Sequence, residues 1–517
     1  MQTRAPQLPD WLARCAENMP ERLAVQCRAT HWSFAELARQ ANRLARQLAA
    51  AGVSEGSRVA LLASNGLAYV AFVHALTRLG AILVPLNTRL TLDELCWQLR
   101  DVRAALLVSD ASMTERANQL GAALPDLPRA TLQTSSPAPG CSDIMLLSLT
   151  SRPYPEAGIT PRALIDLDAT QIIMYTSGTT GHPKGVLITY NMQWWNAIGS
   201  ALNLELHAND CWLACLPLFH IGGLSILMRS VIYGISVVLL EKFDEYAVNQ
   251  AIQRDGVTII SVVAVMLQRM LAALHAGGET ASYPETLRCV LLGGGPAPRP
   301  LLEECARLNI PVAQTYGLTE SCSQAVTLAP ADALRKLGSA GRPLLPVQLQ
   351  IMREDRPAPA GETGVIYLKG PTITPGYADR PEATAAAFQN GWFCTGDLGY
   401  LDADGYLYVL DRRSDLIISG GENVYPAEIE SVLLAHPGVA EAGVCGQSDP
   451  QWGQVPIAFV KLHPGAQTSP EAILEHARQR LARYKVPRAI YIVEELPRNS
   501  SGKLLRRELP RLLPIAS

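Results

Sequence analysis

The hydrophobic positions in the first few hundred residues switch repeatedly between helical and strand spacing. Residues 33–49 place apolar side chains about every 3.6 positions, which predicts an amphipathic helix. Residues 59–62 form a short apolar run typical of a buried strand, residues 67–80 return to helical spacing, and residues 81–85 predict another strand. Helices that alternate with strands in this way predict α/β layers built on mostly parallel sheets.

Two stretches depart from this alternation. Residues 125–165 are rich in Pro, Ser and Thr with weak periodicity, so we expect a meandering surface segment there. Residues 221–240 (IGGLSILMRSVIYGISVVLL) are long and apolar enough to be compared with a membrane span. Arg229 interrupts this stretch, and Gly, Ser and Tyr dilute it, so the pattern favours a buried helix followed by a strand.

The pattern changes after about residue 360. Residues 364–369 predict a strand, and Asp404-Gly405 between two short apolar runs predicts a hairpin. Residues 426–436 and 470–483 predict helices.

Chain length supports a division into two domains. From about residue 414 the chain suffices for an α+β domain of roughly 100 residues. We therefore expect a large domain over residues 1–413 and a small one over residues 414–517.

Composition narrows the classes of protein to consider. The chain has 517 residues, 48% of them hydrophobic, with a net charge of −3 and no long block of like charge. This argues against nucleic-acid partners and a membrane-spanning protein, and leaves a homo-oligomer open. Eleven scattered cysteines argue against a disulfide framework and for a reducing compartment, the cytoplasm. The first residues lack the apolar core of a signal peptide.

A glycine-rich loop carries the clearest chemistry. Residues 171–186 read QIIMYTSGTTGHPKGV, an apolar strand followed by glycines, hydroxyls and Lys184. Glycines allow turns that aim successive N–H groups at an anion, which suits a polyphosphate. The Gly-Lys-Ser/Thr ending of a Walker loop is absent, and a strand-like run follows. The alternative is an ordinary flexible loop. The candidate phosphate-binding residues are Thr176, Ser177, Gly178, Thr179, Thr180 and Gly181.

The loop resembles the phosphate loop of the adenylate-forming superfamily, which includes acyl-CoA synthetases, firefly-luciferase-like enzymes and peptide-synthetase adenylation domains. Six further segments resemble its other motifs in the same order: residues 293–298 (GGGPAP), 316–320 (YGLTE), 395–397 (TGD), 411–415 (DRRSD), 420–426 (GGENVYP) and 497–503 (PRNSSGK). One such motif is weak evidence, whereas seven in order are specific. The resemblance implies an α/β fold, with a large N-terminal domain of layered sheets and helices and a small mobile α+β C-terminal domain.

The resemblance also implies a reaction. ATP with Mg²⁺ would convert a carboxylic acid into an acyl-adenylate, and the acyl group would pass to the thiol of coenzyme A. Tyr316 is expected to stack on adenine, Glu320 to hold Mg²⁺, and Asp397 with Arg412 to bind the ribose. Lys503 would bridge the α-phosphate and the reacting carboxylate, although a lysine near a basic C-terminus is more often a solvated charge.

Further positions follow from the same resemblance. Thr179 and Lys184 join Lys503 as catalytic residues. The other nucleotide- and CoA-binding positions are Gly294, Gly295, Pro296, Thr315, Gly317, Thr319, Gly420, Gly421 and Glu422. The small domain is expected to swing about residues 411–415 between the two half-reactions, with Ser414 at a pivot position where the superfamily often has Asp or Lys.

The acid should bind between residues 217–230, 261–266 and 293–297, with Gly293, Gly294 and Leu318 at the pocket. His220 is expected near the carboxylate; the alternative is a buried structural histidine. Arg229 would recognise a second carboxylate on the substrate. The alternative for Arg229 is a helix end that reaches water.

Longer segments narrow the resemblance. Residues 216–234 and 411–437 resemble the o-succinylbenzoate–CoA ligases of menaquinone biosynthesis, whose substrate has two carboxylates. Other hypotheses stay open: a medium-chain, aryl or crotonobetaine-type acyl-CoA ligase, a stand-alone adenylation protein that loads a carrier domain, and a non-catalytic relative. No carrier domain follows in this sequence, which favours free CoA, and the intact Glu320, Asp397 and Lys503 argue against loss of catalysis.

Overall fold

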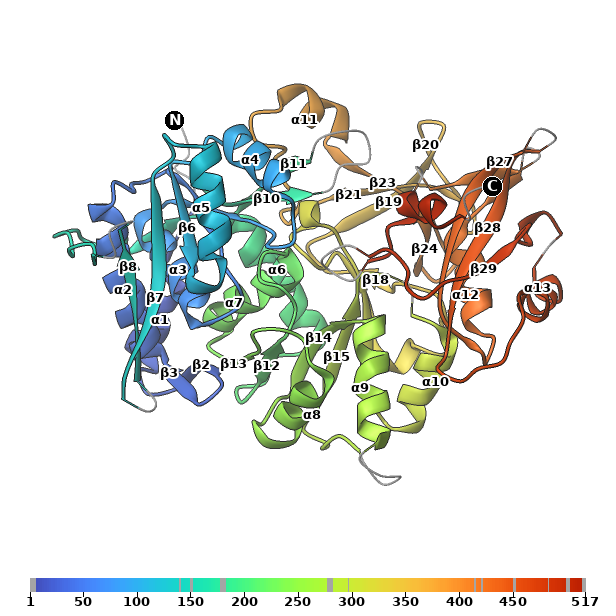
Figure 1. Ribbon diagram of the computed structural model, residues 1–517, viewed down its shortest axis with the longest axis horizontal. Coiled ribbons are helices and arrows are strands. Elements are labelled where there is room, and N and C mark those ends of the chain that lie inside the picture. The colour runs from blue at the N-terminus through green and yellow to red at the C-terminus, as the bar shows by residue number, and fades with distance from the viewer. Residues whose placement is uncertain are drawn as a thin grey trace.

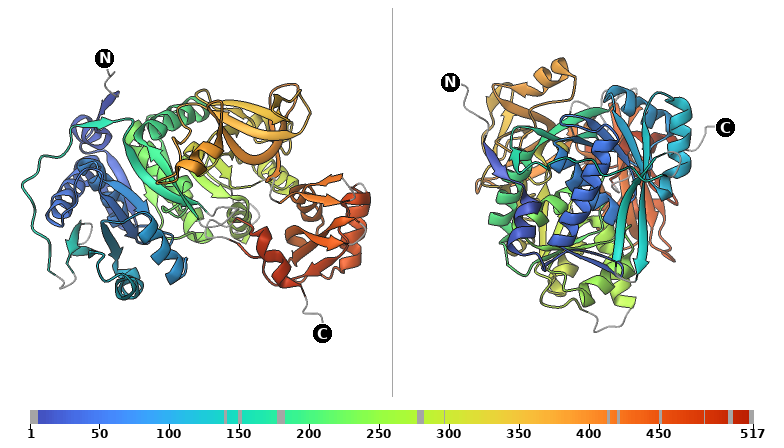
Figure 2. Two further views of the ribbon diagram at one scale, coloured as in Figure 1. Left: turned by 90° about the horizontal axis from the view of Figure 1, so that it is seen from above. Right: turned by 90° about the vertical axis from the view of Figure 1, so that its left-hand side faces the viewer.

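The computed structural model contains a large N-terminal part and a smaller C-terminal lobe, which stand side by side in both Figure 1 and Figure 2. The structure describes residues 6–138, 141–148, 152–176, 183–276, 282–295, 297–412, 415–419, 422–449, 452–481, 483–498 and 503–513. The α/β fold class expected from the alternating pattern is confirmed.

A seven-stranded sheet forms one layer of the large part. Its order is β11-β10-β5-β4-β6-β7-β8, with parallel pairing from β10 to β7 and an antiparallel strand at each edge. The strands are β11 (Lys184–Thr189), β10 (Thr170–Thr176), β5 (Ile82–Pro85), β4 (Arg58–Leu62), β6 (Leu106–Asp110), β7 (Arg129–Ala138) and β8 (Cys141–Leu147). The predicted strands at 59–62 and 81–85 are therefore central strands of this sheet.

A nine-stranded sheet forms the second layer. Its order is β18-β17-β16-β15-β14-β12-β13-β2-β3, with parallel pairing from β16 to β2. The strands are β18 (Arg342–Pro343), β17 (Val326–Leu328), β16 (Val312–Tyr316), β15 (Cys289–Gly293), β14 (Ile259–Val263), β12 (Cys211–Ala214), β13 (Ser236–Leu239), β2 (Leu23–Cys27) and β3 (Thr30–Ser33).

Helices fill the space between the two sheets and cover their outer faces. One core joins both sheets to α1 (Trp11–Asn18), α2 (Phe34–Ala50), α3 (Leu67–Leu79) and α7 (Ile221–Tyr233). Alternate residues of the central strands point to opposite cores: Val59 lies in the inner core and Ala60 in the outer core with α4 (Leu92–Asp101). The other outer core packs α8 (Glu245–Arg254), α9 (Ala264–Ala276) and α10 (Arg299–Arg307) on the nine-stranded sheet.

Local sequence explains where these helices begin and end. The predicted helix over 33–49 is α2, whose N-cap Ser33 accepts a hydrogen bond from the Glu36 amide. The predicted helix over 67–80 is α3, which ends at Gly80 in the left-handed region with φ +69°.

We expected a meandering segment over residues 125–165, and this expectation is wrong for the first half of the range. β7 and β8 pair antiparallel and extend the seven-stranded sheet. Ala130 and Leu132 on β7, and Ile144 and Leu146 on β8, are buried in the inner core. Strand spacing of two holds these residues, but the many Pro, Ser and Thr residues around them hide it in the sequence.

The apolar stretch 221–240 forms a buried helix and strand as expected. α7 covers Ile221–Tyr233 and β13 covers Ser236–Leu239. Within the described part of the chain, no helix is long and apolar enough to cross a membrane.

A third sheet follows the large sheets. It orders β20 (Arg356–Pro357), β19 (Gln348–Arg353), β21 (Gly364–Lys369), β23 (Trp392–Leu401) and β22 (Phe388–Gln389), and β24 (Leu407–Arg412) pairs with β23. The predicted hairpin joins β23 to β24, and Gly405 adopts φ +79° in its turn.

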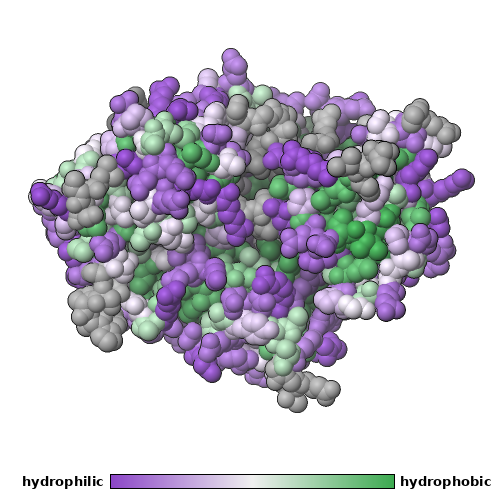
Figure 3. Space-filling view, in the orientation of Figure 1, coloured by the Kyte–Doolittle hydropathy of each residue, from purple (hydrophilic) through white to green (hydrophobic). Residues whose placement is uncertain are grey.

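The C-terminal lobe is an α+β unit. Its sheet holds β26 (Glu422–Val424), β25 (Ile417–Ser419), β28 (Gly453–Leu462), β27 (Val439–Asp449) and β29 (Ile490–Ile492). Helices α12 (Pro426–Leu434) and α13 (Pro470–Arg478) pack on one face, and the second helix is shorter than predicted. Figure 3 shows mostly hydrophilic side chains on the visible face and a hydrophobic area on this lobe.

Candidate active site

The predicted nucleotide motifs meet at one edge of the nine-stranded sheet. β14, β15 and β16 are parallel neighbours, so their carboxyl ends lie at the same edge. Gly293 ends β15 and Tyr316 ends β16, which places the two motifs next to each other. In open α/β sheets, this is the edge where ligands bind.

Tyr316 and Asp397 form the clearest contact between two motifs. The Tyr316 hydroxyl donates to Asp397 Oδ2 at 2.7 Å, and Asp397 is 6% exposed. The Asp397 amide donates to the Thr395 hydroxyl oxygen at 3.0 Å, within the same Thr-Gly-Asp motif. Arg412 is the residue of β24 opposite Asp397 in the register. These positions fit a site that aligns acceptors for ribose hydroxyls.

Glycines permit the close approaches in this edge. Gly294 has φ +83°, where a side chain would be strained and its Cβ would lie 3.0 Å from Val263. A Cβ on Gly317 would lie 1.5 Å from the carbonyl oxygen of Ser323. The chain after Tyr316 therefore folds back tightly on itself, and only glycine fits at its first position.

The turn that follows holds two consecutive non-glycine residues with positive φ. Cys322 has φ +57° and Ser323 has φ +94°. Such a conformation costs free energy and persists only where neighbouring contacts hold it. Hydrogen bonds between the Ser321 hydroxyl and Leu318 brace the start of the turn, at 2.9 and 3.1 Å.

Glu320 and Lys184 are linked through Tyr377, which the sequence analysis missed. The Tyr377 hydroxyl donates to Glu320 Oε1 at 3.2 Å, and the Lys184 ammonium lies 5.1 Å from the Tyr377 ring centre. Burial, and next the charge of Glu320, raise the pKa of Tyr377. Tyr377 therefore stays protonated, and its hydroxyl acts as a hydrogen-bond donor to Glu320. No periodic pattern marked Tyr377, because it lies in an irregular segment between β21 and α11 (Pro381–Ala387).

A single carboxylate at Glu320 fits the way Mg²⁺ is usually held with nucleotides. Mg²⁺ keeps several waters and binds one or two carboxylates together with substrate phosphates. Across the described ranges, no group of three or more His, Cys, Asp or Glu could hold a metal by itself. Glu320 would thus hold an ion that enters with the triphosphate.

His220 stands at the start of α7 as its N-cap, and its side chain makes no capping hydrogen bond. The Phe219 and His220 rings lie 4.7 Å apart. Burial, and next the charge of Arg89, lower the pKa of His220 to about 4. The imidazole is therefore neutral at pH 7, which suits a hydrogen-bonding group beside a carboxylate rather than a fixed cation.

Arg229 lies in the middle of α7 and is 2% exposed, so the alternative of a helix end reaching water is wrong. Its Nη2 donates to Asn196 Oδ1 at 2.6 Å, and its guanidinium lies 5.2 Å from the Trp212 ring centre. Burial lowers the pKa of Arg229, and its Nε has no hydrogen-bond partner. None of the ion pairs within the described residues includes Arg229.

Arg78 gives a useful comparison. It is a second buried arginine, 5% exposed, on α3, and its Nη1 pairs with Asp10 Oδ1 at 3.1 Å. A buried charge ordinarily needs such a partner. Arg229 thus differs from an arginine with a purely structural role, since it carries a buried charge without a protein carboxylate.

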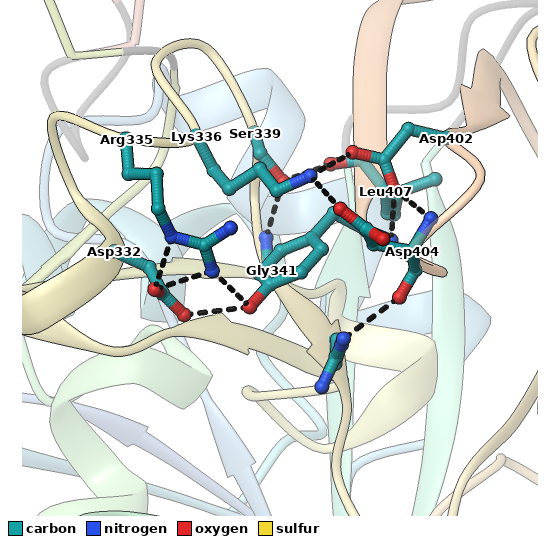
Figure 4. Close-up of polar contacts among 10 residues, drawn as sticks. Asp332, Arg335, Lys336, Ser339, Gly341, Asp402, Asp404 and Leu407 are labelled. Atoms are coloured by element: carbon teal, nitrogen blue, oxygen red, sulfur yellow. Dashed lines mark hydrogen bonds and ion pairs between the residues drawn. The ribbon is translucent and has the colours of Figure 1, made fainter.

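A polar clamp fixes the hairpin that carries Asp397 and Arg412 (Figure 4). Lys336 Nζ contacts Asp402 Oδ2 at 2.7 Å and Asp404 Oδ2 at 2.6 Å, and Ser339 Oγ donates to the Leu407 carbonyl at 2.8 Å. These contacts tie the segment after β17 to the turn end of the hairpin.

An aromatic ring completes the clamp. The Tyr406 hydroxyl donates to Asp332 at 2.6 Å, and the Lys336 ammonium lies 4.6 Å from the Tyr406 ring centre. The turn end of the hairpin is therefore held against the segment after β17 by ion pairs, hydrogen bonds and a ring contact.

Several predicted site residues lie at positions that reveal no contact between motifs. Thr176 and Lys184 face each other across β10 and β11, and Thr315 donates to the Val326 carbonyl at 2.9 Å. Lys503 is exposed in the C-terminal lobe. Thr319 and Leu318 lie in the turn after Tyr316, and nothing within 4 Å would contact a Cβ on Gly295. The side chains of Arg412 and Glu422 lie outside the described part of the structure. So do the following predicted residues as a whole: Ser177, Gly178, Thr179, Thr180, Gly181, Pro296, Ser414, Gly420 and Gly421.

Asn196 is the second residue that the sequence analysis missed. It lies on α6 (Tyr190–Leu204), and Gln193, Asn196 and Ser200 are buried on that helix. Polar residues three and four positions apart on one helix face were a signal in the sequence, because that face should otherwise be apolar.

Comparison with known proteins defines the class. Residues 12–378 match the model of the AMP-binding enzymes, and residues 428–503 match the model of the AMP-binding enzyme C-terminal domain. The adenylate-forming fold expected from the motifs is thereby confirmed.

Relatives that match along nearly the whole chain narrow this class to one family. The chain is 54% identical to a 2-succinylbenzoate–CoA ligase of Geobacillus kaustophilus, and the match covers 98% of both chains. It is 45% identical to the o-succinylbenzoate CoA synthetase of Bacillus subtilis in complex with its acyl-adenylate intermediate, with a TM-score of 0.87 and 98% of both chains covered. The chain therefore belongs to the AMP-binding enzymes and, within them, to the family of 2-succinylbenzoate–CoA ligases.

Two other complexes of the same Bacillus subtilis enzyme match this chain to different degrees. Its complex with ATP and magnesium gives a TM-score of 0.87 at 44% identity, covering 98% of this chain and 100% of that chain. A double mutant of that enzyme bound to a product analogue gives a TM-score of 0.72 at 44% identity, covering 98% of this chain and 99% of that chain. The present structure thus resembles the nucleotide complexes more closely than the product-analogue complex.

Proposed function

We propose that this chain joins 2-succinylbenzoate to coenzyme A in two steps. In the first step, an oxygen of the succinyl carboxylate attacks the α-phosphorus of ATP, and diphosphate leaves. In the second step, the CoA thiol attacks the acyl carbon, and AMP leaves. The products are 2-succinylbenzoyl-CoA, AMP and diphosphate.

The residues of the edge site have roles that fit the first step. Tyr316 and Asp397 would hold the nucleoside, and Glu320 would hold Mg²⁺ with the phosphates. Positioning and charge neutralisation carry most of such a transfer. Lys503 would stabilise the charge that develops between the α-phosphate and the attacking carboxylate.

The observation that carries the choice of acid is the buried, unpaired charge of Arg229. A dicarboxylate offers one group for activation and a second group for a protein cation. In the described structure the guanidinium has Asn196 and Trp212 as neighbours but no carboxylate. The ring carboxylate of 2-succinylbenzoate would supply the missing partner. Neutral His220 would lie near the carboxylate that reacts.

A measurement of product formation tests this function. Diphosphate release and thioester formation are followed with ATP, Mg²⁺ and CoA for 2-succinylbenzoate, benzoate, octanoate and crotonobetaine. We expect a strong preference for 2-succinylbenzoate, with CoA thioester as product. A preference for one of the monoacids would remove the role of Arg229, and adenylate without thioester would indicate a protein that loads a carrier domain.

We also propose that the residues from 414 onward move as a domain between the two steps. The two TM-scores against one relative support this, because they differ between its nucleotide and product-analogue complexes. Residues 411–415 would form the hinge, and residues 420–422 would help to bind pantetheine. We further propose that the protein is cytoplasmic. The ten described cysteine side chains are free thiols, as expected in a reducing compartment, which supports this localisation.

A further inference from the structure

Asn196 lies between the arginine assigned to the acid and the turn that carries Glu320. Its Oδ1 accepts from Arg229 Nη2 at 2.6 Å. Its Nδ2 donates to the main-chain carbonyls of Ser321 at 3.3 Å and Gln324 at 2.8 Å. The side chain is 1% exposed, so water does not compete for these three bonds.

The two carbonyls that Asn196 holds flank a strained turn. Ser321 and Gln324 stand on either side of Cys322 and Ser323, the consecutive residues with positive φ. A residue in this region persists only when its surroundings hold it there. The amide of Asn196 therefore closes the turn from one side, as the hydrogen bonds of Ser321 to Leu318 do from within.

The same turn positions the metal-binding carboxylate. Glu320 precedes Ser321 directly, its carbonyl accepts from the Thr374 amide at 2.8 Å, and its side chain accepts from Tyr377. Hydrogen bonds and one short turn thus run without interruption from the Arg229 guanidinium to the Glu320 carboxylate. A carboxylate that draws the guanidinium toward itself would act on the amide and hence on the turn.

We infer that Asn196 is a positioning residue that couples binding of the acid at Arg229 to binding of ATP and Mg²⁺ at Glu320. This inference rests on the proposed function, since it takes Arg229 as the partner of the acid. Coupling between two ligands is reciprocal, so the acid would tighten nucleotide binding by the same factor as the nucleotide tightens acid binding. The enzyme would thereby favour ATP when the correct acid is present.

Equilibrium binding measures this coupling. The probe is α,β-methylene ATP with Mg²⁺, which cannot release diphosphate, titrated into the full-length enzyme with and without saturating 2-succinylbenzoate. In the unaltered enzyme we expect the acid to lower the dissociation constant of the analogue at least about fivefold, the lower end of typical couplings. In Asn196→Ala we expect this factor to fall to about one.

A matched control comes from the same helix. Ser200 is one turn further along α6 and 1% exposed. Its hydroxyl accepts from the Gln324 side chain at 3.3 Å, whereas Asn196 donates to main-chain carbonyls of the turn. Ser200→Ala should keep the coupling factor of the unaltered enzyme. If Asn196→Ala does not fold, Asn196→Leu replaces it, because it fills a similar volume without a charge and lacks both donors to the turn.

The outcomes separate two failures. If the unaltered enzyme does not form thioester from 2-succinylbenzoate, the proposed function fails and this inference with it. If it does form thioester, but the acid leaves nucleotide affinity unchanged or the Asn196 variants keep the full factor, only the coupling role of Asn196 is overturned. A variant that weakens nucleotide binding equally with and without acid would make Asn196 a structural residue alone.

Discussion

Replacement of Arg229 by methionine separates recognition of a carboxylate from a structural role. Methionine has a similar length and fills the space that the 2% exposed side chain occupies. The change removes the hydrogen bond to Asn196 and the contact with the Trp212 ring. The same change removes a buried charge without a carboxylate partner, which costs the folded state free energy.

The expected effect on stability is small because these contributions oppose each other. A hydrogen bond to a charged group contributes about 1.5–3 kcal/mol, and a buried cation–π contact about 2 kcal/mol. Relief of an uncompensated buried charge offsets a loss of this size. We expect the free energy of unfolding to change by less than about 2 kcal/mol, measured by urea denaturation.

The expected effect on catalysis is large and specific. Loss of one partner in a buried charge pair costs about 2–4 kcal/mol, so kcat/KM for 2-succinylbenzoate should fall about 30- to 700-fold. The matched substrate is 4-oxo-4-phenylbutanoate, which has the same succinyl arm but no ring carboxylate. We expect its kcat/KM to change little in the same variant.

Arg78→Met is the control for burial. Arg78 is almost as buried, but its removal leaves Asp10 buried without its partner. We expect a loss of about 3–5 kcal/mol in stability, with little effect on the ratio between the two acids. The reasoning on Arg229 is refuted if Arg229→Met destabilises the protein as much as Arg78→Met and lowers kcat/KM equally for both acids.

Three further predictions test other parts of the site. Lys503→Ala should slow adenylate formation severely but let CoA react with supplied acyl-adenylate; equal losses in both half-reactions, followed separately by quench flow, would contradict the proposed domain movement. Tyr377→Phe removes the hydrogen bond to Glu320 but keeps the ring beside Lys184, so the KM for Mg–ATP should rise about five- to tenfold while the KM for the acid stays constant; the opposite pattern would exclude a role in metal binding. The pKa of His220 is lowered to about 4, so between about pH 6.5 and pH 4 the unfolded chain binds a proton that the folded chain does not. Stability therefore decreases as the pH is lowered through this window, by about 2 kcal/mol from pH 6.5 to pH 5. His220→Gln should reduce this dependence in urea titrations at several pH values, and an unchanged dependence would disprove the assignment.

The amino-acid sequence by itself determined the elements and the chemistry that depend on neighbours along the chain. Helical and strand spacing predicted α2, α3, β4 and β5, because that spacing reports which side of an element is buried. The ordered motifs predicted Tyr316, Glu320 and Asp397 as site residues through their resemblance to the adenylate-forming superfamily, which short local segments can carry. The hairpin of β7 and β8 escaped because turn-forming residues surround its alternating apolar positions.

Only the tertiary structure decided what lies around the buried polar groups. The sequence left Arg229 between a water-exposed helix end and a substrate contact, and burial on α7 removed the first alternative. Tyr377 meets Glu320 from 57 residues away, and Asn196 meets the turn after Glu320 from more than 120 residues away. Such contacts depend on how sheets and helices pack in three dimensions, and local spacing along the chain carries no information about that packing.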